Sequence, residues 1–250
     1  MKNKIFIFTG AGISAESGLS TFRGEDGIWN NYDLNKVCNY NYLSSNVRNN
    51  EIRKEIFSFY QNLYELVCKA KPNKAHDVCY EIQQKYGIEN VVIMTTNVDD
   101  LHEKSGAKNV LHLHGSINEM LCIACANIWA IKKIDFQERC PKCNSRVTKP
   151  NVVFFGEYAP NYKKLYSFLH PKNTNDKDIL LVIGSSLEVI SVDKLIRTDR
   201  YHTKRTENIL INKEKTDFDH YFKHHLIGNA TEKIEEAKEL IEKLKEKINV

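Results

Sequence analysis

The chain has 250 residues, which is enough for one large domain with a second, smaller lobe. Hydrophobic residues make up 42% of it, so a globular core is expected, and no apolar run approaches the length of a membrane span. Its 36 basic and 32 acidic residues leave a formal net charge of +4, which is too small to indicate nucleic acid as a partner.

Short apolar segments separated by helical patterns predict a parallel sheet. We expect strands at Lys4–Thr9, Val91–Thr96, Asn109–His114, Asn151–Gly156, Ile179–Gly184 and Glu207–Asn212. Helical patterns lie between them, notably at Ile52–Lys69 and His76–Lys85. Strands that alternate with helices are typical of an α/β fold with a parallel sheet covered on both faces. Its functional loops should leave the carboxyl ends of the strands.

The first and last segments are each interpreted as ordinary elements of the domain. The first offers only four apolar residues before Thr9 and Gly10, which predicts a strand and not a signal peptide. The last, Thr231–Ile248, has apolar residues on one helical face and glutamates in its first turns, where they complement the helix dipole. We expect a solvated helix on the edge of the domain. A coiled coil is the alternative, although the segment has fewer than three heptads.

Four of the seven cysteines form two CxxC pairs, Cys122 with Cys125 and Cys140 with Cys143. Four thiolates at this spacing can close around one tetrahedral Zn²⁺, and four protein ligands leave no open position for chemistry. We therefore predict one structural zinc, with two disulfides as the alternative. The other three cysteines are scattered and odd in number, which suits free thiols in a reducing cytoplasm.

The first strand runs into the turn Gly10-Ala11-Gly12. A Gly-x-Gly turn after a strand lets the backbone approach a phosphate, and a following helix offers free N–H groups. A dehydrogenase would continue into a second strand with an acidic residue about 20 positions later. Here a Gly-rich polar loop continues as far as Trp29. Such a loop could close over a dinucleotide, and it argues against ordinary hydride transfer.

A series of motifs along the chain carries a family resemblance. They occur in the order Gly10–Gly18, Thr21–Gly24, Thr95–Asp99, Leu113–Gly115, the two CxxC pairs, Phe154–Glu157, Gly184–Val189 and Ile211–Asn212. From about residue 4 to residue 230 the chain resembles a sirtuin, an NAD-dependent protein-lysine deacylase, of the compact bacterial kind. The resemblance implies a Rossmann-like NAD-binding domain of residues 1–28, 72–118 and 148–250. It also implies a small lobe made of a helical module, residues 29–71, and a zinc-binding module, residues 119–147.

The resemblance also implies which residues bind NAD, which the family consumes as a co-substrate. The expected set is Gly10, Ala11, Gly12, Ser14, Phe22, Arg23, Trp29, Thr96, Asn97, Asp99, Gly184, Ser185, Ser186, Asn212, Glu214 and Ala230. Thr96 departs from the family pattern, because the family usually has a glutamine there that contacts the nicotinamide ribose. The shorter threonine cannot make the same reach.

His114 is implied as the general base. In the family mechanism the acyl-lysine amide oxygen attacks C1′ of the nicotinamide ribose and nicotinamide leaves. The histidine then takes a proton from a ribose hydroxyl, and water finally releases lysine and O-acyl-ADP-ribose. Imidazole suits this step because its ordinary pKa lies near working pH. A lone histidine on a strand is more often structural, and only the Leu113-His114-Gly115 context favours catalysis, whereas His102 is expected to be a helix-start residue.

The acylated peptide would lie as a strand between two loops of the chain, with main-chain pairing supplying affinity. The implied substrate residues are Tyr60, Leu63, Val153, Phe155, Gly156, Glu157, Glu188 and Val189. In the branch that this chain most resembles, a Tyr-x-x-Arg pair binds acidic acyl groups such as succinyl. Here Tyr60 is in place, but Leu63 stands at the arginine position and cannot pair with a carboxylate. Leu63 would instead extend an apolar wall that suits acetyl or longer hydrocarbon chains. We therefore predict deacetylation and poor desuccinylation, with removal of longer fatty acyl chains left open.

Three functions are compared on the sequence. The first is a cytoplasmic, monomeric NAD-dependent deacylase of acylated lysine-containing proteins or peptides, without a specific nucleic-acid partner or a membrane. Thr96 keeps a second open, an NAD-dependent protein ADP-ribosyltransferase on the same scaffold. The third is a non-enzymatic zinc-ribbon protein that binds nucleic acid. The sequence around the cysteines argues against it, because Asp135 and Glu138 offset the basic residues there.

Overall fold

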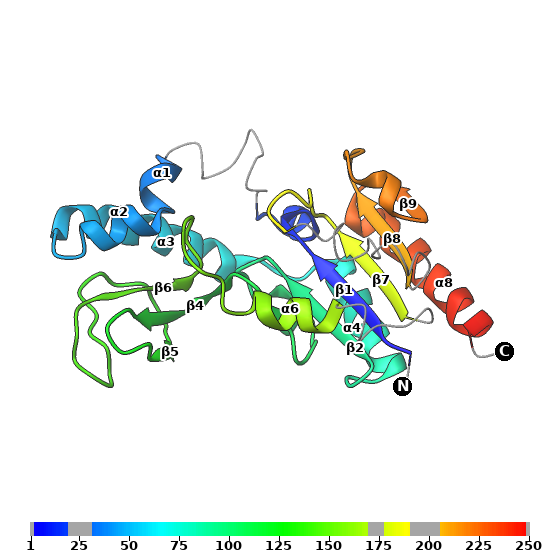
Figure 1. The fold of residues 1–250 in the computed structure, drawn as a ribbon, viewed down its shortest axis with the longest axis horizontal. Helices are drawn as coiled ribbons and strands as arrows, with labels where there is room; N and C mark the ends of the chain where they lie inside the picture. The colour runs from blue at the N-terminus through cyan, green and yellow to red at the C-terminus, as the bar shows by residue number, and fades with distance from the viewer. Residues whose placement is uncertain (1–2, 20–31, 170–177, 191–205, 249–250) are drawn as a thin grey trace.

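The apolar segments of the sequence become strands in a computed structural model, which describes residues 3–19, 32–169, 178–190 and 206–248 (Figure 1). The strands are β1 (Ile5–Thr9), β2 (Val91–Thr95), β3 (Leu111–His112), β4 (Gly115–Cys122), β5 (Ile128–Ala130), β6 (Thr148–Val152), β7 (Asp178–Ile183), β8 (Thr206–Asn212) and β9 (His224–Ile227). The α-helices are α1 (Leu34–Val37), α2 (Tyr40–Ser45), α3 (Asn50–Lys69), α4 (Lys74–Tyr86), α5 (Leu101–Lys104), α6 (Tyr162–Leu169) and α8 (Ala230–Ile248). Short 3-10 helices are η1 (Ala11–Ile13), η2 (Ala15–Ser17) and η4 (Asp219–Tyr221).

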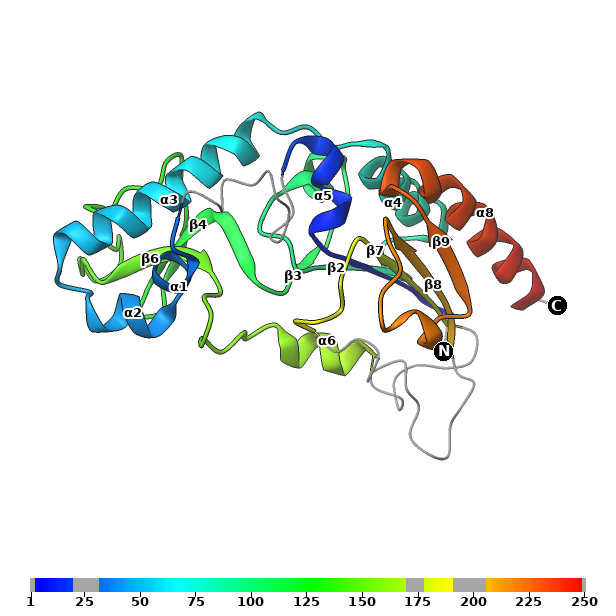
Figure 2. The ribbon, with the colours of Figure 1, turned by 90° about the horizontal axis from the view of Figure 1, so that it is seen from above.

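Six of these strands form one parallel sheet in the order β3-β2-β1-β7-β8-β9. Every residue of β1 and β7 is buried, as strands covered on both faces require. Ile5 and Ile7 pack with α4 and α8 on one face, and Phe6 and Phe8 pack with α6 on the other. Figure 2 shows this layering, with α4 and α8 on one side of the sheet and α6 on the opposite side. The predicted α/β fold with a parallel sheet is confirmed.

The expected helices are also confirmed, each with ends within two residues of the prediction. Asn49 begins α3 by accepting hydrogen bonds from two backbone N–H groups, and Asn73 begins α4 in the same manner. The last helix, α8, buries one apolar face on the sheet, including Ile234 and Ile241. This position matches a solvated helix packed on the edge of the domain.

Two of the predicted strands need correction. The strand expected at Asn151–Gly156 is wrong after Val152, because Phe154–Glu157 folds as a turn. In that turn the Glu157 N–H donates to the Phe154 carbonyl at 3.0 Å, and Gly156 has a φ of +81°. The sixth strand of the parallel sheet is instead β9, whose start with two histidines gives no strand pattern. The strand expected at Asn109–His114 is reduced to the two residues of β3.

The remaining strands belong to a smaller lobe, on the left of Figure 1. They form an antiparallel sheet in the order β5-β4-β6. Apolar residues of α3, among them Ile56 and Phe59, pack with Ile117 and Met120 of β4. The residue boundaries of the domain and its two modules stay predictions.

The helices within the described ranges were also compared with the requirements of a membrane span. None of them combines the length and the apolar character that crossing a bilayer needs.

Candidate active site

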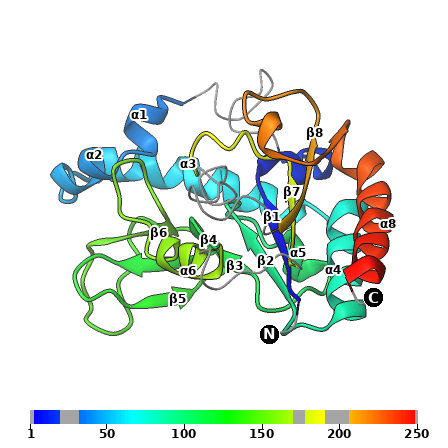
Figure 3. The same cartoon turned by 45° about the vertical axis from the view of Figure 1, so that its right-hand side comes forward.

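Four strands of the parallel sheet end at one level, so the loops that follow them leave the sheet side by side. Thr9 at the end of β1 is in register with Thr95 of β2 and with Ile183 of β7, and Thr95 is in register with His112 of β3. Figure 3 shows the turns after β1 and β7 together at this end of the sheet. We call this end, with the loops that leave it, the sheet edge. It collects the residues after β1, β2, β3 and β7 that the resemblance implies for NAD and for catalysis.

Glycines at the sheet edge allow two turns to touch through their backbones. The Gly12 N–H donates to the Gly184 carbonyl at 2.9 Å. A Cβ added to Gly12 would lie 2.6 Å from the Gly184 Cα, and one added to Gly10 would lie 2.6 Å from the Gly184 carbonyl oxygen. The turn continues into η1 and η2, and not into the regular helix of a phosphate-binding turn. Close packing on the turn after β7 is therefore sufficient reason for glycine at both positions.

A buried polar network links the loop after β1 to the loop after β2. The Ser14 hydroxyl donates to an Asp99 carboxylate oxygen at 3.0 Å and accepts from the Asn97 side-chain amide at 3.0 Å. All three side chains are less than one-tenth exposed. Burial raises the pKa of the Asp99 carboxyl, while hydrogen bonds from the Leu101 N–H and the Ser14 hydroxyl lower it. Three residues expected at NAD therefore form one connected group.

Two histidines lie behind this network and carry no charge at neutral pH. His76 Nε2 is 3.5 Å from the Ser14 hydroxyl, and His102 Nε2 is 3.0 Å from the Thr9 hydroxyl. Burial lowers the pKa of His76 to about 4 and holds the pKa of His102 well below its usual range. His102 lies in the short helix α5, as expected of a helix-start residue. Both rings act here as packed, neutral supports.

His114 follows β3 and is held at both ring nitrogens. Its Nδ1 lies 3.0 Å from the Thr96 carbonyl oxygen, and its Nε2 lies 2.6 Å from the Tyr162 hydroxyl. A carbonyl can only accept, so Nδ1 carries the proton and Nε2 has the lone pair of a base. Burial lowers the pKa of His114, and the Thr96 carbonyl opposes this by raising it. The imidazole is therefore neutral and oriented at neutral pH.

Thr96, which replaces the family's glutamine, is part of this support. Its N–H donates to the Thr9 carbonyl at 3.0 Å, and its hydroxyl lies 3.3 Å from the same oxygen. The side chain is thus turned toward β1. The Thr96 side chain and N–H both contact the last residue of β1, and the Thr96 carbonyl orients His114.

The four cysteines of the CxxC pairs form one cluster, with all four sulfurs within 4.8 Å of one another. The Sγ atoms of Cys122 and Cys143 are 3.6 Å apart, and those of Cys125 and Cys140 are 3.7 Å apart. Tetrahedral zinc with Zn–S bonds of about 2.3 Å requires sulfurs about 3.8 Å apart, whereas a disulfide requires about 2.05 Å. The arrangement fits one tetrahedral metal and does not fit two disulfides.

The two CxxC pairs sit on equivalent turns. After each pair, Ala126 or Asn144 has a positive φ and donates its N–H to the carbonyl of the first cysteine at 2.9 Å. Each turn directs both of its sulfurs to the same point.

These features were compared with known proteins. A family model described as the Sir2 family matches residues 10–191, which is more than half of the chain. The chain belongs to the Sir2 family. The resemblance inferred from the motifs is therefore confirmed.

Two relatives that are similar to this chain are named as NAD-dependent protein deacylases. An NAD-dependent protein deacylase of Campylobacter jejuni subsp. jejuni is 40% identical over 193 residues, which cover 77% of each chain. NAD-dependent protein deacylase 2 of Archaeoglobus fulgidus is 36% identical over 249 residues, which cover 96% of this chain and 91% of that one.

Solved Sir2 structures share the fold over nearly the whole chain. A Sir2 homologue in complex with NAD has a TM-score of 0.76 and 30% identity, over 98% of this chain and 90% of that one. A Sir2 variant solved with a deacetylated p53 peptide and 3′-O-acetyl ADP-ribose has a TM-score of 0.71 and 27% identity, over 95% and 93% of the two chains.

The remaining described residues expected at NAD lie after β7, at or after the end of β8, and at the start of α8. The Asn212 amide donates to the Ser185 carbonyl at 2.9 Å, which joins the loops after β8 and β7. Ser186 and Glu214 are exposed, and Ala230 begins α8. Phe22, Arg23 and Trp29 lie outside the described residues.

The residues expected at the substrate fall into a buried group and an exposed group. Tyr60 and Leu63 are buried on α3, where the Tyr60 ring stacks on Phe154 at 5.1 Å. The exposed group contains Phe155, Gly156, Glu188 and Val189, with Val153 half-buried beside it. These residues lie on loops after β6 and β7.

Main-chain groups of the loop after β6 already have partners inside the chain. The Phe155 N–H donates to the Cys38 carbonyl at 2.7 Å, and the Phe155 carbonyl accepts from the Tyr40 N–H at 3.0 Å. The Glu157 carboxylate accepts from the Phe154 N–H and from buried Lys149, each at 2.9 Å. A substrate strand in this loop therefore has to pair with other main-chain groups, and Glu157 has a structural role.

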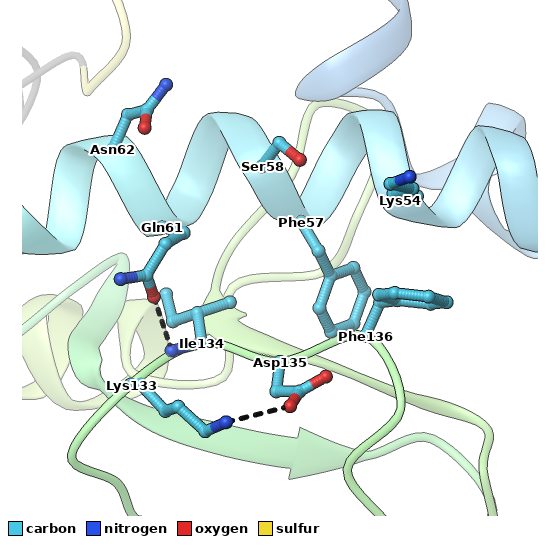
Figure 4. Close-up of a pocket in the computed structure, with 9 residues that line it drawn as sticks. All are labelled: Lys54, Phe57, Ser58, Gln61, Asn62, Lys133, Ile134, Asp135 and Phe136. Carbon is cyan, nitrogen blue, oxygen red and sulfur yellow. Dashed lines mark hydrogen bonds and ion pairs between the residues drawn. The ribbon is translucent and has the colours of Figure 1, made fainter.

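A hollow in the small lobe contains none of the predicted site residues (Figure 4). It lies between α3 and the segment 133–136, where the Gln61 side-chain oxygen accepts from the Ile134 N–H at 2.7 Å. Phe57 and Phe136 line it together with polar residues. Its contacts join the cysteine-containing segment to α3, and it is separate from the sheet edge.

Sequence reasoning missed two residues that contact the sheet edge, Tyr162 and His76. Tyr162 contacts His114 from a position 48 residues away, and no local motif marks it. His76 lies inside a helical pattern in which only its polarity is unusual. Fully buried lysine is also rare, and Lys149 gives no signal in the sequence before its partner Glu157 is placed.

Proposed function

We propose that this chain is an NAD-dependent protein-lysine deacylase that transfers the acyl group to ADP-ribose and releases nicotinamide. The observation that carries the proposal is the orientation of His114. Its Nδ1–H is held by a backbone carbonyl, so that Nε2 is the basic atom at the sheet edge. The relatives named as NAD-dependent deacylases and the homologue solved with NAD support the proposal.

The chemistry of the sheet edge fits the nicotinamide part of NAD. A carboxamide has both a donor and an acceptor, and Asn97 and Asp99 offer an amide and a carboxylate beside Ser14. A carboxylate can accept about four hydrogen bonds, and the Leu101 N–H and the Ser14 hydroxyl account for two. NAD supplies the ribose that receives the acyl group. The protein residues bind and orient it.

His114 acts in this scheme as the general base. Because burial lowers its pKa, the ring is neutral at pH 7 and can accept a proton at Nε2. The Thr96 carbonyl at Nδ1 then stabilises the imidazolium that forms. One side chain and one backbone carbonyl thus provide the base and its orientation.

The four-cysteine cluster is proposed to hold one structural Zn²⁺. Four thiolates fill a tetrahedral shell, so no position remains for a substrate or a reactive water. Zinc then stabilises the turns that carry the cysteines and takes no part in acyl transfer.

We propose acetyl groups as the preferred acyl groups and succinyl groups as poor substrates. The Tyr60 hydroxyl lies 3.6 Å from Cys38 Sγ, and Leu63 adds an apolar surface on the same helix. Arg53, the nearest buried arginine on α3, contacts Thr148 at 3.5 Å and the Phe57 ring. These contacts direct Arg53 to the start of β6, so it does not replace the missing arginine at position 63.

The experiment is a mass-spectrometric assay of one peptide in acetyl-lysine and succinyl-lysine forms, each incubated with the protein and NAD. Formation of nicotinamide, free lysine peptide and O-acetyl-ADP-ribose supports the proposal. Attachment of ADP-ribose to a protein with no loss of the acyl group would replace it by ADP-ribosyl transfer. A kcat/KM higher for succinyl than for acetyl peptide would overturn the acyl preference alone. Acylated proteins as substrates, a monomeric state and a cytoplasmic location remain predictions.

A further inference from the structure

The hydroxyl of Tyr162 is hydrogen-bonded to Nε2 of His114, the atom through which the proposed base would accept a proton. Tyr162 Oη lies 2.6 Å from His114 Nε2, and the two rings are tilted with centroids 5.7 Å apart. Tyr162 begins α6, after the loop that contains Phe155 and Glu157. Neither the motifs of the sequence nor the proposed role of His114 accounts for this contact.

The direction of this hydrogen bond is fixed by its surroundings. The Thr96 carbonyl requires the proton of neutral His114 to be on Nδ1, so Nε2 can only accept. Burial raises the pKa of Tyr162 to about 12, so the phenol keeps its proton and donates it to Nε2. An imidazole nitrogen has one lone pair in the ring plane. The Tyr162 proton therefore fills the basic site of His114.

The position of Tyr162 is fixed by its neighbours on both sides. The Asn161 side-chain amide donates to the His112 carbonyl at 2.8 Å, which ties the start of α6 to β3. Leu165 and Leu169 of the same helix are buried against the sheet with Phe8 and Leu180. Displacing the phenol from His114 would disturb these contacts or force Tyr162 out of its rotamer.

We propose that Tyr162 is a proton relay between the substrate ribose hydroxyl and His114. The proposal rests on the proposed deacylase function, in which His114 is the base. The ribose O–H bond breaks and its proton forms a new bond with Tyr162 Oη, while the Tyr162 proton moves to His114 Nε2. The ribose oxygen keeps the electron pair of its broken bond for attack on the acyl carbon. Tyr162 ends as a neutral phenol, and His114 ends as an imidazolium.

This relay explains how a base with an occupied lone pair can act without moving α6. The proton that reaches Nε2 is the one already bound to Tyr162. A proton from the substrate ribose then takes its place on the Tyr162 oxygen. After transfer, the imidazolium Nε2–H donates to the phenol oxygen, so one hydrogen bond serves both protonation states. The alternative is a phenol that only covers the base and must leave before reaction.

The kinetic test uses Tyr162→Phe, which keeps the ring and removes the hydroxyl, with Tyr166→Phe as the matched control. Tyr166 lies one turn later on α6, its ring contacts Tyr162, and it is 46% exposed. We expect Tyr162→Phe to lower the deacylation rate by at least about tenfold, since a group that moves a proton contributes about 10²–10⁴-fold. Exchange of labelled nicotinamide into NAD should persist, because it precedes proton transfer to His114. Tyr166→Phe should behave as the wild type in both assays.

A double variant separates a relay from a general loss of structure. If Tyr162 acts through His114, adding Tyr162→Phe to His114→Ala should change the residual rate less than about twofold. Further loss of both deacylation and exchange in the double variant would overturn the relay, because Tyr162 would then act independently of His114. Deacylation by Tyr162→Phe equal to or faster than that of the wild type would overturn the relay and identify the phenol as a cover.

A measurement on the protein without NAD tests the hydrogen bond itself. Nitrogen-15 NMR of the histidine rings should show a change at His114 Nε2 in Tyr162→Phe and no change in Tyr166→Phe. Unchanged His114 signals in Tyr162→Phe would remove the structural basis of the relay. If the wild-type protein itself does not deacylate, the proposed function fails. If only the relay fails, the wild-type protein still deacylates and His114→Ala still loses activity.

Discussion

The sheet edge and the cysteine module, residues 122–147, are both polar regions, but they are held in opposite ways. Ser14, Asn97 and Asp99 are buried at the ends of strands whose two faces are covered by apolar cores. In residues 123–147, in contrast, only Ile134 and Cys140 are buried. Core packing therefore fixes the geometry of the sheet edge, whereas the module has too little apolar burial to hold its shape without its four sulfur ligands.

The largest expected effect is the loss of a metal ligand in the module. Cys122→Ser or Cys143→Ala should unfold the small lobe and bring the metal content toward zero, because zinc binding in such modules supplies about 10–16 kcal/mol. Elemental analysis and thermal unfolding measure both, with the exposed Cys68→Ser as the control. A variant that loses metal but keeps its Tm and full activity would contradict a structural zinc.

A buried ion pair in the small lobe gives the second prediction. Lys149 Nζ lies 2.9 Å from the Glu157 carboxylate, and its side chain is 2% exposed. Glu157→Gln leaves the ammonium without its charge partner and should lower the free energy of unfolding by about 3–5 kcal/mol. Glu207→Gln, which removes the partner of the exposed Lys223 beside the parallel sheet, should cost at most about 1 kcal/mol.

Urea denaturation of the two glutamate variants measures the difference. A loss below about 1 kcal/mol for Glu157→Gln would mean that Lys149 gives up its proton when its partner is removed. Burial lowers the pKa of Lys149 and the Glu157 carboxylate raises it, so such a small loss would contradict the prediction that the ammonium stays charged without its partner.

The neutral histidines predict acid sensitivity at the sheet edge. Burial lowers the pKa of His76 from 6.5 to about 4, so between these values the unfolded chain binds a proton that the folded chain does not. Stability is therefore lost as the pH falls through this window, by about 2 kcal/mol between pH 7 and pH 5 for this residue. His76→Gln should reduce that loss in denaturation curves at the two pH values. An identical loss in both proteins would show that His76 is protonated in the folded state.

The smallest effect is expected at Thr96. Its hydroxyl makes only a long contact of 3.3 Å to the Thr9 carbonyl, so its removal should cost less than about 1 kcal/mol. Thr96→Gln should leave the deacylation rate unchanged or raise it, by restoring a longer side chain toward the ribose, and Thr96→Ser serves as the control that keeps the hydroxyl. Steady-state kinetics with an acetyl peptide decides this. A clear loss with an intact fold would indicate that Thr96 serves another use of NAD, such as transfer.

A region could be predicted from the sequence where the residues that mark it lie close together in the chain. Fully apolar runs such as Ile179–Ile183 identify buried strands, and two CxxC pairs identify a metal cluster, because each signal lies within a few residues. β9 was missed because it begins with two histidines and is stabilised by its neighbour β8. The turn at Phe154–Glu157 was predicted as a strand because the main-chain hydrogen bonds that Phe155 makes with residues 38–40 come from a distant segment.

The same reasoning applies to the active site. His114 could be proposed from its motif, but its partner Tyr162 depends on the packing of α6 against the sheet. The buried network of Ser14, Asn97 and Asp99 joins two motifs that the sequence presents 83 or more residues apart. The motifs therefore identify residues of the site, whereas their contacts with one another follow only from the fold.

The most direct test of the account is the deacylation rate of His114→Ala beside the wild type, on one acetyl-lysine peptide with saturating NAD. We predict that the variant keeps the wild-type Tm and binds NAD, while its rate falls about 10²–10⁴-fold because the base is lost. A rate within roughly tenfold of the wild type would contradict the assignment of His114 as the general base and of the sheet edge as the place of the chemistry.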